Sequence, residues 1–272
     1  MNIAQVELRK LLSFKVIYIA LFFCLFLLTL FFYSSGFNIS SFDPEFWKSM
    51  RDFMPRNGAW FVAIMIVVGI SRMLPYEIET GIDELLKTYK QKTKLLFAKL
   101  YVVFIYCLSM VTLFYGIAFV VYGWAYSLEG YNLSMAEVNA NMWVDLQIGS
   151  FTQWQYLLYE YTHLVFISFS YGLCVLTVSL FVKKSVWVMA VCGGFFALFE
   201  FFDGFLGQFL STSETWSFLF VVYKYSYNGM LHLAYLERVD LTQLWQLILY
   251  LVVQIVTLTC VIIITYKRRT RS

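Results

Sequence analysis

Side chains capable of catalytic or metal chemistry are sparse in this sequence. All five cysteines lie within apolar runs, and no pair has the spacing of a CxxC or metal-binding motif. We therefore interpret them as small buried hydrophobic residues. The two histidines, His163 and His232, are too few and too far apart to predict paired haem ligation. A membrane cytochrome is thereby disfavoured.

Two groups of ionisable residues lie close to apolar runs. Glu160, Tyr161 and His163 suit proton or metal handling by type. They lack a second metal ligand at workable spacing, so we favour an interfacial histidine. Glu200 and Asp203 matter because ionisable groups inside a membrane span are costly and often line a pathway. Glu200 lies roughly 21 Å along its predicted helix, which favours an ordinary interfacial position and leaves a pathway role as the alternative.

The composition indicates how these residues are positioned. The chain of 272 residues is 61% hydrophobic, 21% aromatic and only 14% charged, which is typical of a polytopic membrane protein. Its first apolar run has no small-residue cleavage site, so we expect it to remain as a membrane span. We predict an all-α membrane protein with one transmembrane domain over residues 1–272.

Six apolar segments are long enough to cross a bilayer as helices. They are residues 14–32, 58–74, 100–126, 161–182, 186–202 and 244–266. Residues 1–12 are predicted to form a separate helix on the membrane surface, although Glu7 interrupts its apolar face. The alternative is a frayed continuation of the first span.

The distribution of Lys and Arg predicts the orientation of these spans. Of the 20 basic residues, fifteen fall on the side that holds the N-terminus, Arg72 with the segment 75–99, the turn 183–185 and the C-terminal tail. Since basic loops stay in the cytoplasm, we expect both termini and these connections to be cytoplasmic.

A charged segment, 75–99 (PYEIETGIDELLKTYKQKTKLLFAK), separates the second and third spans. Its spacing predicts an amphipathic helix that begins near Thr80, with Asp83 completing a capping box. The apolar face of this helix consists of Ile82, Leu85, Leu86 and Tyr89. Such a helix either packs on its own bundle or inserts into a soluble motor subunit, and its spacing alone does not decide between the two.

Several features together resemble the ATP-binding cassette (ABC) type-2 permease family, the membrane half of many bacterial exporters. Glu7 and Lys10 precede the first span, as in the family's opening helix. The order of residues after span two is similar to the family pattern E-x-x-x-G…LL-x-T…K. The residues that carry it are Glu77, Glu79, Gly81, Leu85, Leu86, Lys87, Thr88 and Lys99. Tyr89 and Lys94 depart from the family's usual Pro and Arg.

The resemblance implies a permease that couples ATP hydrolysis by a separate ABC ATPase to export. No G-x-x-x-x-G-K-[ST] loop occurs in the chain, so we expect ATP to be bound by the partner and no cofactor here. The expected partners are that ATPase, a second permease subunit in a homodimer or heterodimer, and the lipid bilayer, with no nucleic acid. The residues expected to couple to the ATPase are Glu79, Gly81, Ile82, Leu85, Leu86 and Tyr89.

The substrate is not specified by any motif, and the apolar spans favour an amphipathic or hydrophobic molecule such as a peptide, an antibiotic or a lipid-like compound. The expected location is the bacterial cell membrane. The alternative function, from a different class, is an integral membrane enzyme or assembly factor with no motor partner.

Overall fold

The computed structural model describes residues 3–34, 45–53, 58–82, 92–126, 128–134, 151–210 and 241–269. Within these ranges the chain is helical, and its one β-type contact is an isolated bridge between Ser134 and Thr152. The prediction of an all-α protein is confirmed for this part of the chain.

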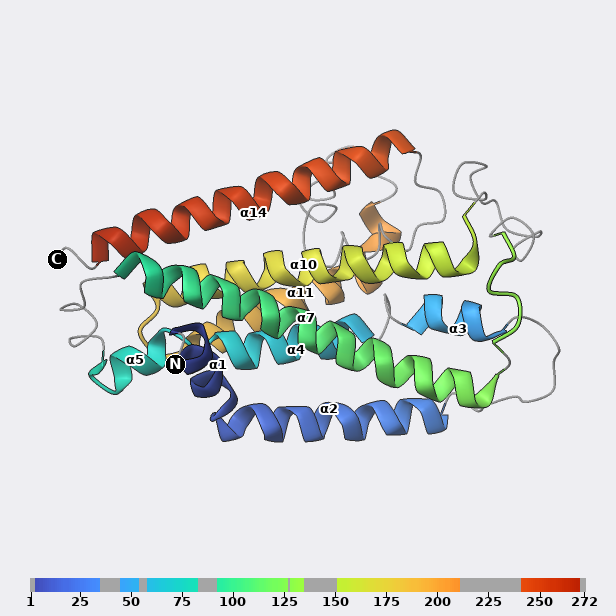
Figure 1. The fold of residues 1–272 in the computed structure, drawn as a ribbon, viewed down its shortest axis with the longest axis horizontal. Coiled ribbons are helices and arrows are strands. Elements are labelled where there is room, and N and C mark those ends of the chain that lie inside the picture. Colours follow the sequence, from blue (N-terminus) through green and yellow to red (C-terminus); the bar gives the residue numbers. More distant parts are fainter. Residues whose placement is uncertain are drawn as a thin grey trace.

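The helices follow one another as a bundle of long antiparallel elements with shorter helices at both ends (Figure 1). They are α1 (Ile3–Leu12), α2 (Lys15–Ser34), α3 (Glu45–Phe53), α4 (Ala59–Ile70), α5 (Pro75–Glu79), α7 (Lys92–Ala125), α10 (Gln153–Phe181), α11 (Ser185–Leu210) and α14 (Leu241–Arg269). α1 is a helix of its own, because the chain turns at Ser13 and Phe14 before α2 begins. It is therefore not a frayed continuation of the first span.

Five of the described helical segments are long and apolar enough to cross a membrane. They are Lys15–Phe32, Ala59–Glu79, Thr93–Ala125, Gln153–Phe181 and Ile248–Arg268. The chain is thus a multi-pass membrane protein by the character of its helices, and five of the six predicted spans are confirmed in this sense. The predicted span 186–202 falls in α11, whose apolar part among the described residues, Ser185–Leu198, is shorter.

α10 is the central helix of the bundle, because it packs against α4, α7, α11 and α14. α4 is apolar on every side and is also enclosed: 67% of the span that contains it is buried inside the protein. The corresponding figure for α14 is 11%, so most of its apolar surface faces outward. That surface is suited to lipid, in which an apolar exposed face has no cost.

The segments rich in Lys and Arg lie together at one end of the bundle. Figure 1 places the N-terminus, α5, the start of α7 and the C-terminal end of α14 at the same end. α10 ends and α11 begins there as well, joined by the turn that contains Lys183 and Lys184. The sequence predicted these segments on one side, and the fold brings them there.

Candidate functional site

The candidate site lies at this basic end, where α1, α5 and the first turns of α7 meet. α5 begins with Pro75, whose fixed backbone suits a first helical position. It ends at Thr80, and Gly81 follows with a φ of +72°, a conformation that strongly favours glycine. The Thr80 hydroxyl donates a hydrogen bond back to the Tyr76 carbonyl oxygen at 2.7 Å.

The Thr80 hydroxyl thus caps the end of a preceding helix, which the predicted span 58–74 did not include. Asp83, the other member of the predicted capping box, lies outside the described residues, so a helix that begins near Thr80 stays a prediction. The helical character continues past Arg72 as far as Glu79.

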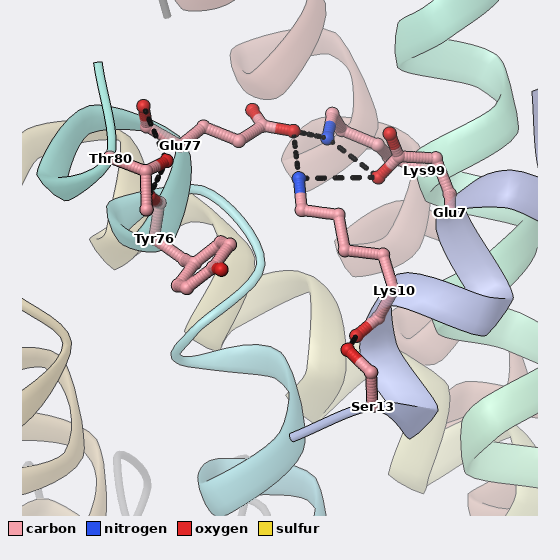
Figure 2. A network of polar contacts seen from close by, with 7 residues as sticks. All are labelled: Glu7, Lys10, Ser13, Tyr76, Glu77, Thr80 and Lys99. Carbon is pink, nitrogen blue, oxygen red and sulfur yellow. Dashed lines mark hydrogen bonds and ion pairs between the residues drawn. The ribbon is translucent and has the colours of Figure 1, made fainter. Parts of the chain in front are cut away.

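Four charged side chains form a closed network between the three elements, here called the ion network: Glu7, Lys10, Glu77 and Lys99 (Figure 2). Lys99 Nζ donates hydrogen bonds to Glu7 Oε2 at 2.8 Å and to Glu77 Oε1 at 2.5 Å. Lys10 Nζ donates to the same Glu77 oxygen at 2.5 Å and lies 4.0 Å from Glu7 Oε2. Two acids and two bases make the network electrically neutral.

The network is enclosed by protein. The Lys99 side chain is completely buried, and the side chains of Glu77 and Glu7 are 4% and 8% exposed. Taking an ammonium group out of water costs several kcal/mol unless it is paired and hydrogen-bonded. The two carboxylates therefore make the buried position of Lys99 possible, and Lys99 in turn makes theirs possible.

The ion network explains the irregularity in the N-terminal helix. Glu7 interrupts the apolar face of α1 because that face packs on α7 and meets Lys99 there. A carboxylate on this face was the signal in the sequence that a buried cation lies opposite. No spacing pattern in the sequence identified Lys99 as that cation, since Glu7 and Lys99 are 92 positions apart.

Aromatic rings cover the network on the side of α5. Lys10 Nζ lies 5.9 Å from the centre of the Tyr76 ring, and Tyr76 makes an edge-on contact with Phe14 at 5.0 Å. The Arg72 guanidinium lies 5.7 Å from the centre of the Phe14 ring. These distances are within the range of cation–π attraction, so Phe14, which follows α1, is joined to the end of span two by contacts outside the ion network.

Glu79, the first residue of the predicted coupling set, contacts a different part of the bundle. Its Oε1 accepts a hydrogen bond from the Ser185 backbone N–H at 3.1 Å, with the Ser185 hydroxyl at 3.5 Å. Ser185 is the first residue of α11, where backbone N–H groups are unpaired and a negative charge is favourable. Glu79 therefore caps α11 from another helix.

The other predicted coupling residues are only partly described. Gly81 and Ile82 are exposed, and Ile82 retains 37% of its accessible surface. Leu85, Leu86 and Tyr89 lie outside the described residues, so the predicted amphipathic helix stays a prediction. Glu200 and Asp203 belong to the second half of α11 by backbone position.

Glu160 and His163 are both buried inside the protein, with 3% and 5% of their surface exposed. The interfacial position predicted for His163 concerns its depth in the membrane and stays a prediction. Among the described residues no cluster of three or more His, Cys, Asp or Glu side chains is suited to hold a metal ion.

Comparison with protein-family models, with curated proteins and with solved structures finds no match to this chain. A functional proposal therefore depends on the residues themselves and on their arrangement.

Proposed function

We propose that this chain is the membrane-spanning permease subunit of an ABC exporter in the bacterial cell membrane. A separate ABC ATPase binds and hydrolyses ATP, and a second permease subunit completes a homodimer or heterodimer. The exported substrate is amphipathic or hydrophobic. Both termini are cytoplasmic, and α11 provides the sixth span.

The ion network is the observation that supports this proposal best. Its four members are residues on which the family resemblance depends, two from the opening helix, one from the segment after span two and one from the head of span three. They come from distant parts of the sequence and meet in one buried cluster. A resemblance based on loose motifs gains weight when the matching residues are structural partners.

The position of the ion network also suits mechanical coupling. Residues 80–91 connect α5 to α7, and both ends of this connection are held by it: Glu77 lies three residues before Thr80, and Lys99 lies in the second turn of α7. A displacement of the connection by a motor subunit would thus be passed to α1 and α7 together. Through its hydrogen bond to Ser185, Glu79 would pass the same displacement to the start of α11.

The directions in which the helices run support six spans, because the chain must cross the bundle once between the end of α10 and the start of α14. α10 ends at the basic end of the bundle, and α14 begins at the opposite end and returns to it (Figure 1). α11 runs away from the basic end, and its 26 residues correspond to roughly 39 Å of helix, more than the roughly 30 Å of hydrocarbon that a span must cross.

The test is co-purification with the ATPase, normalised to the amount of permease in the membrane. Leu85→Asp places a charge on the predicted apolar face of the coupling segment. Each leucine there contributes roughly 1.5–3 kcal/mol of burial, so its loss should weaken ATPase binding tenfold or more. The matched control is Leu133→Asp, which changes an exposed leucine whose backbone is hydrogen-bonded to the first residue of α10, far along the chain from the coupling segment. It should leave ATPase binding unchanged.

Two results would contradict the proposal. If no ATPase accompanies the unsubstituted chain, the motor-independent alternative, an integral membrane enzyme or assembly factor, is favoured. If Leu85→Asp inserts normally and binds the ATPase undiminished, residues 82–89 are not the coupling helix.

A further inference from the structure

The N-terminal helix α1 has two unlike faces. Its inward face packs on α7 and carries Glu7 and Leu11, which are buried. Its outward face carries Val6, Arg9 and Leu12, which follow one another at intervals of three residues and so lie on one side of the helix. All three are exposed, and Val6 and Leu12 keep 42% and 40% of their accessible surface. The outward face therefore combines a positive charge with apolar side chains.

The acidic side chains near α1 are bonded to other groups of the protein. Among the described residues of the basic end, the acids are Glu7, Glu77 and Glu79. Glu7 and Glu77 are buried in the ion network, where Lys99 donates a hydrogen bond to each. Glu79 accepts a hydrogen bond from the Ser185 backbone N–H. The fold thus turns the one acid of α1 inward and leaves basic side chains on the outside.

The outward face of α1 continues onto the first turn of α2. Only Ser13 and Phe14 separate the two helices, and Lys15, the first residue of α2, is exposed. Tyr18, one turn further along, is also exposed, and both lie at the start of a segment suited to cross a membrane. Lys and Tyr side chains at the end of a span are typical of the boundary between membrane and water. The outward face of α1 therefore lies close to this boundary.

Positive charge next to exposed apolar side chains at this boundary fits an anionic lipid surface. The apolar side chains of such a helix enter the region between head groups and acyl chains. Each Lys or Arg near an anionic surface strengthens binding roughly fivefold. An acidic soluble protein would match the charge, but it would not explain why the same surface continues into the exposed apolar residues Tyr18 and Ile19 of a span. Lipid is the partner that matches both.

We propose that Val6, Arg9, Leu12 and Lys15 form a surface that binds anionic phospholipids, here called the lipid surface. Val6 and Leu12 enter the boundary between head groups and acyl chains, and Arg9 and Lys15 contact the lipid phosphate groups. The ion network supports this surface, because it holds Glu7 on the opposite face of α1. Lipid binding here needs neither an ATPase nor transport, so this proposal and the exporter function fail separately.

The test is fluorescence quenching by brominated lipids, read at the lipid surface itself. A bimane fluorophore is attached through Ser13→Cys, an exposed position between Arg9 and Lys15. The background is Cys260→Ser, because Cys260 is the exposed one of the five native cysteines. The full-length chain is placed in vesicles of equal parts phosphatidylglycerol and phosphatidylcholine, in which one or the other lipid is brominated. Brominated phosphatidylglycerol should be preferred at the fluorophore by at least about fivefold, and high salt should reduce this preference.

Two variants assign the preference to the lipid surface. Arg9→Gln combined with Lys15→Gln removes both charges and should make quenching by the two lipids nearly equal. Arg9→Lys combined with Lys15→Arg keeps both charges and is the matched control, which should retain the preference. The Cys260→Ser chain without Ser13→Cys measures any labelling of the other cysteines.

Equal quenching by the two lipids with Arg9 and Lys15 in place overturns the proposal, as does a preference that survives the loss of both charges. Quenching by neither lipid also overturns it and favours an acidic soluble partner. The Ser13 hydroxyl donates a hydrogen bond to the Lys10 carbonyl oxygen at 2.7 Å. Should its replacement prevent folding, Val6→Cys gives the same measurement from within α1 and decides in the same way.

Discussion

Replacing Lys99 by methionine tests whether the ion network holds the basic end of the protein together. Methionine keeps most of the length of the lysine side chain but removes the ammonium group. Glu7 and Glu77 would then remain buried, 8% and 4% exposed, with Lys10 as their shared cation. Removing one member of a buried ion pair typically costs about 3–5 kcal/mol, because it leaves an uncompensated charge. We expect Lys99→Met to lower the free energy of unfolding by this amount.

The assay is denaturant unfolding of the purified protein in detergent, with Lys94→Met as the matched control. Lys94 is an exposed lysine at the start of the same helix, so its loss should change stability by less than about 0.5 kcal/mol. The double variant Glu77→Gln, Lys99→Met removes one charge of each sign and should be more stable than Lys99→Met alone. If Lys99→Met is no less stable than Lys94→Met, or if the double variant gains nothing, the network does not have the structural role assigned to it.

Three further predictions concern packing and topology. Gly69→Ala should lower the unfolding free energy by about 1–3 kcal/mol, because its Cβ would lie 2.5 Å from the Tyr106 hydroxyl oxygen and 2.6 Å from a carbon of its ring. A fully stable Gly69→Ala would contradict the close approach. In intact cells, a cysteine at Lys184 should be protected from an impermeant thiol reagent while a cysteine at Glu129 reacts. Lys184 directly precedes α11 and Glu129 follows α7, and the start of α11 and the end of α7 lie at opposite ends of the bundle (Figure 1). Equal labelling would exclude the orientation. Deleting residues 268–272 should reduce membrane insertion but leave transport per inserted molecule unchanged. The reason is that basic residues near an anionic surface contribute only about 1 kcal/mol each to membrane binding. Loss of transport at normal membrane abundance would show that the tail does more than orient the protein.

The long helices were predictable because their signal is local. A run of twenty apolar residues has few alternatives to a helix, since every backbone polar group must be satisfied within the segment. The first and last residues of these helices were harder to predict. α7 begins at Lys92 and α10 at Gln153, both before the predicted spans, because polar residues can continue a helix beyond the apolar run. The sequence therefore indicated where the chain is apolar better than where each helix begins.

The partners within the ion network were not predictable from spacing. Lys10 and Glu77 are 67 positions apart, so no periodicity connects them. Glu7 on an apolar helix face did indicate that a cation lies opposite it. The family resemblance included all four residues but did not predict that they are in contact. Thr80 shows what a local motif leaves out: its hydroxyl caps the end of α5, a helix that follows from the longer span two and not from the motif itself.

The arrangement of Glu77 and Glu79 shows why a helix of five residues can organise this end of the protein. Residues two apart on a helix do not face the same side, and these two glutamates accordingly contact different parts of the bundle. Glu77 contacts α1 and α7 through Lys10 and Lys99, whereas Glu79 contacts the first residue of α11. Pro75 at the start of α5 and Gly81 after its end make α5 a short unit with defined ends. Any displacement of the chain that leaves α5 at Thr80 is therefore divided between the opening helix with α7 on one side and the turn between α10 and α11 on the other.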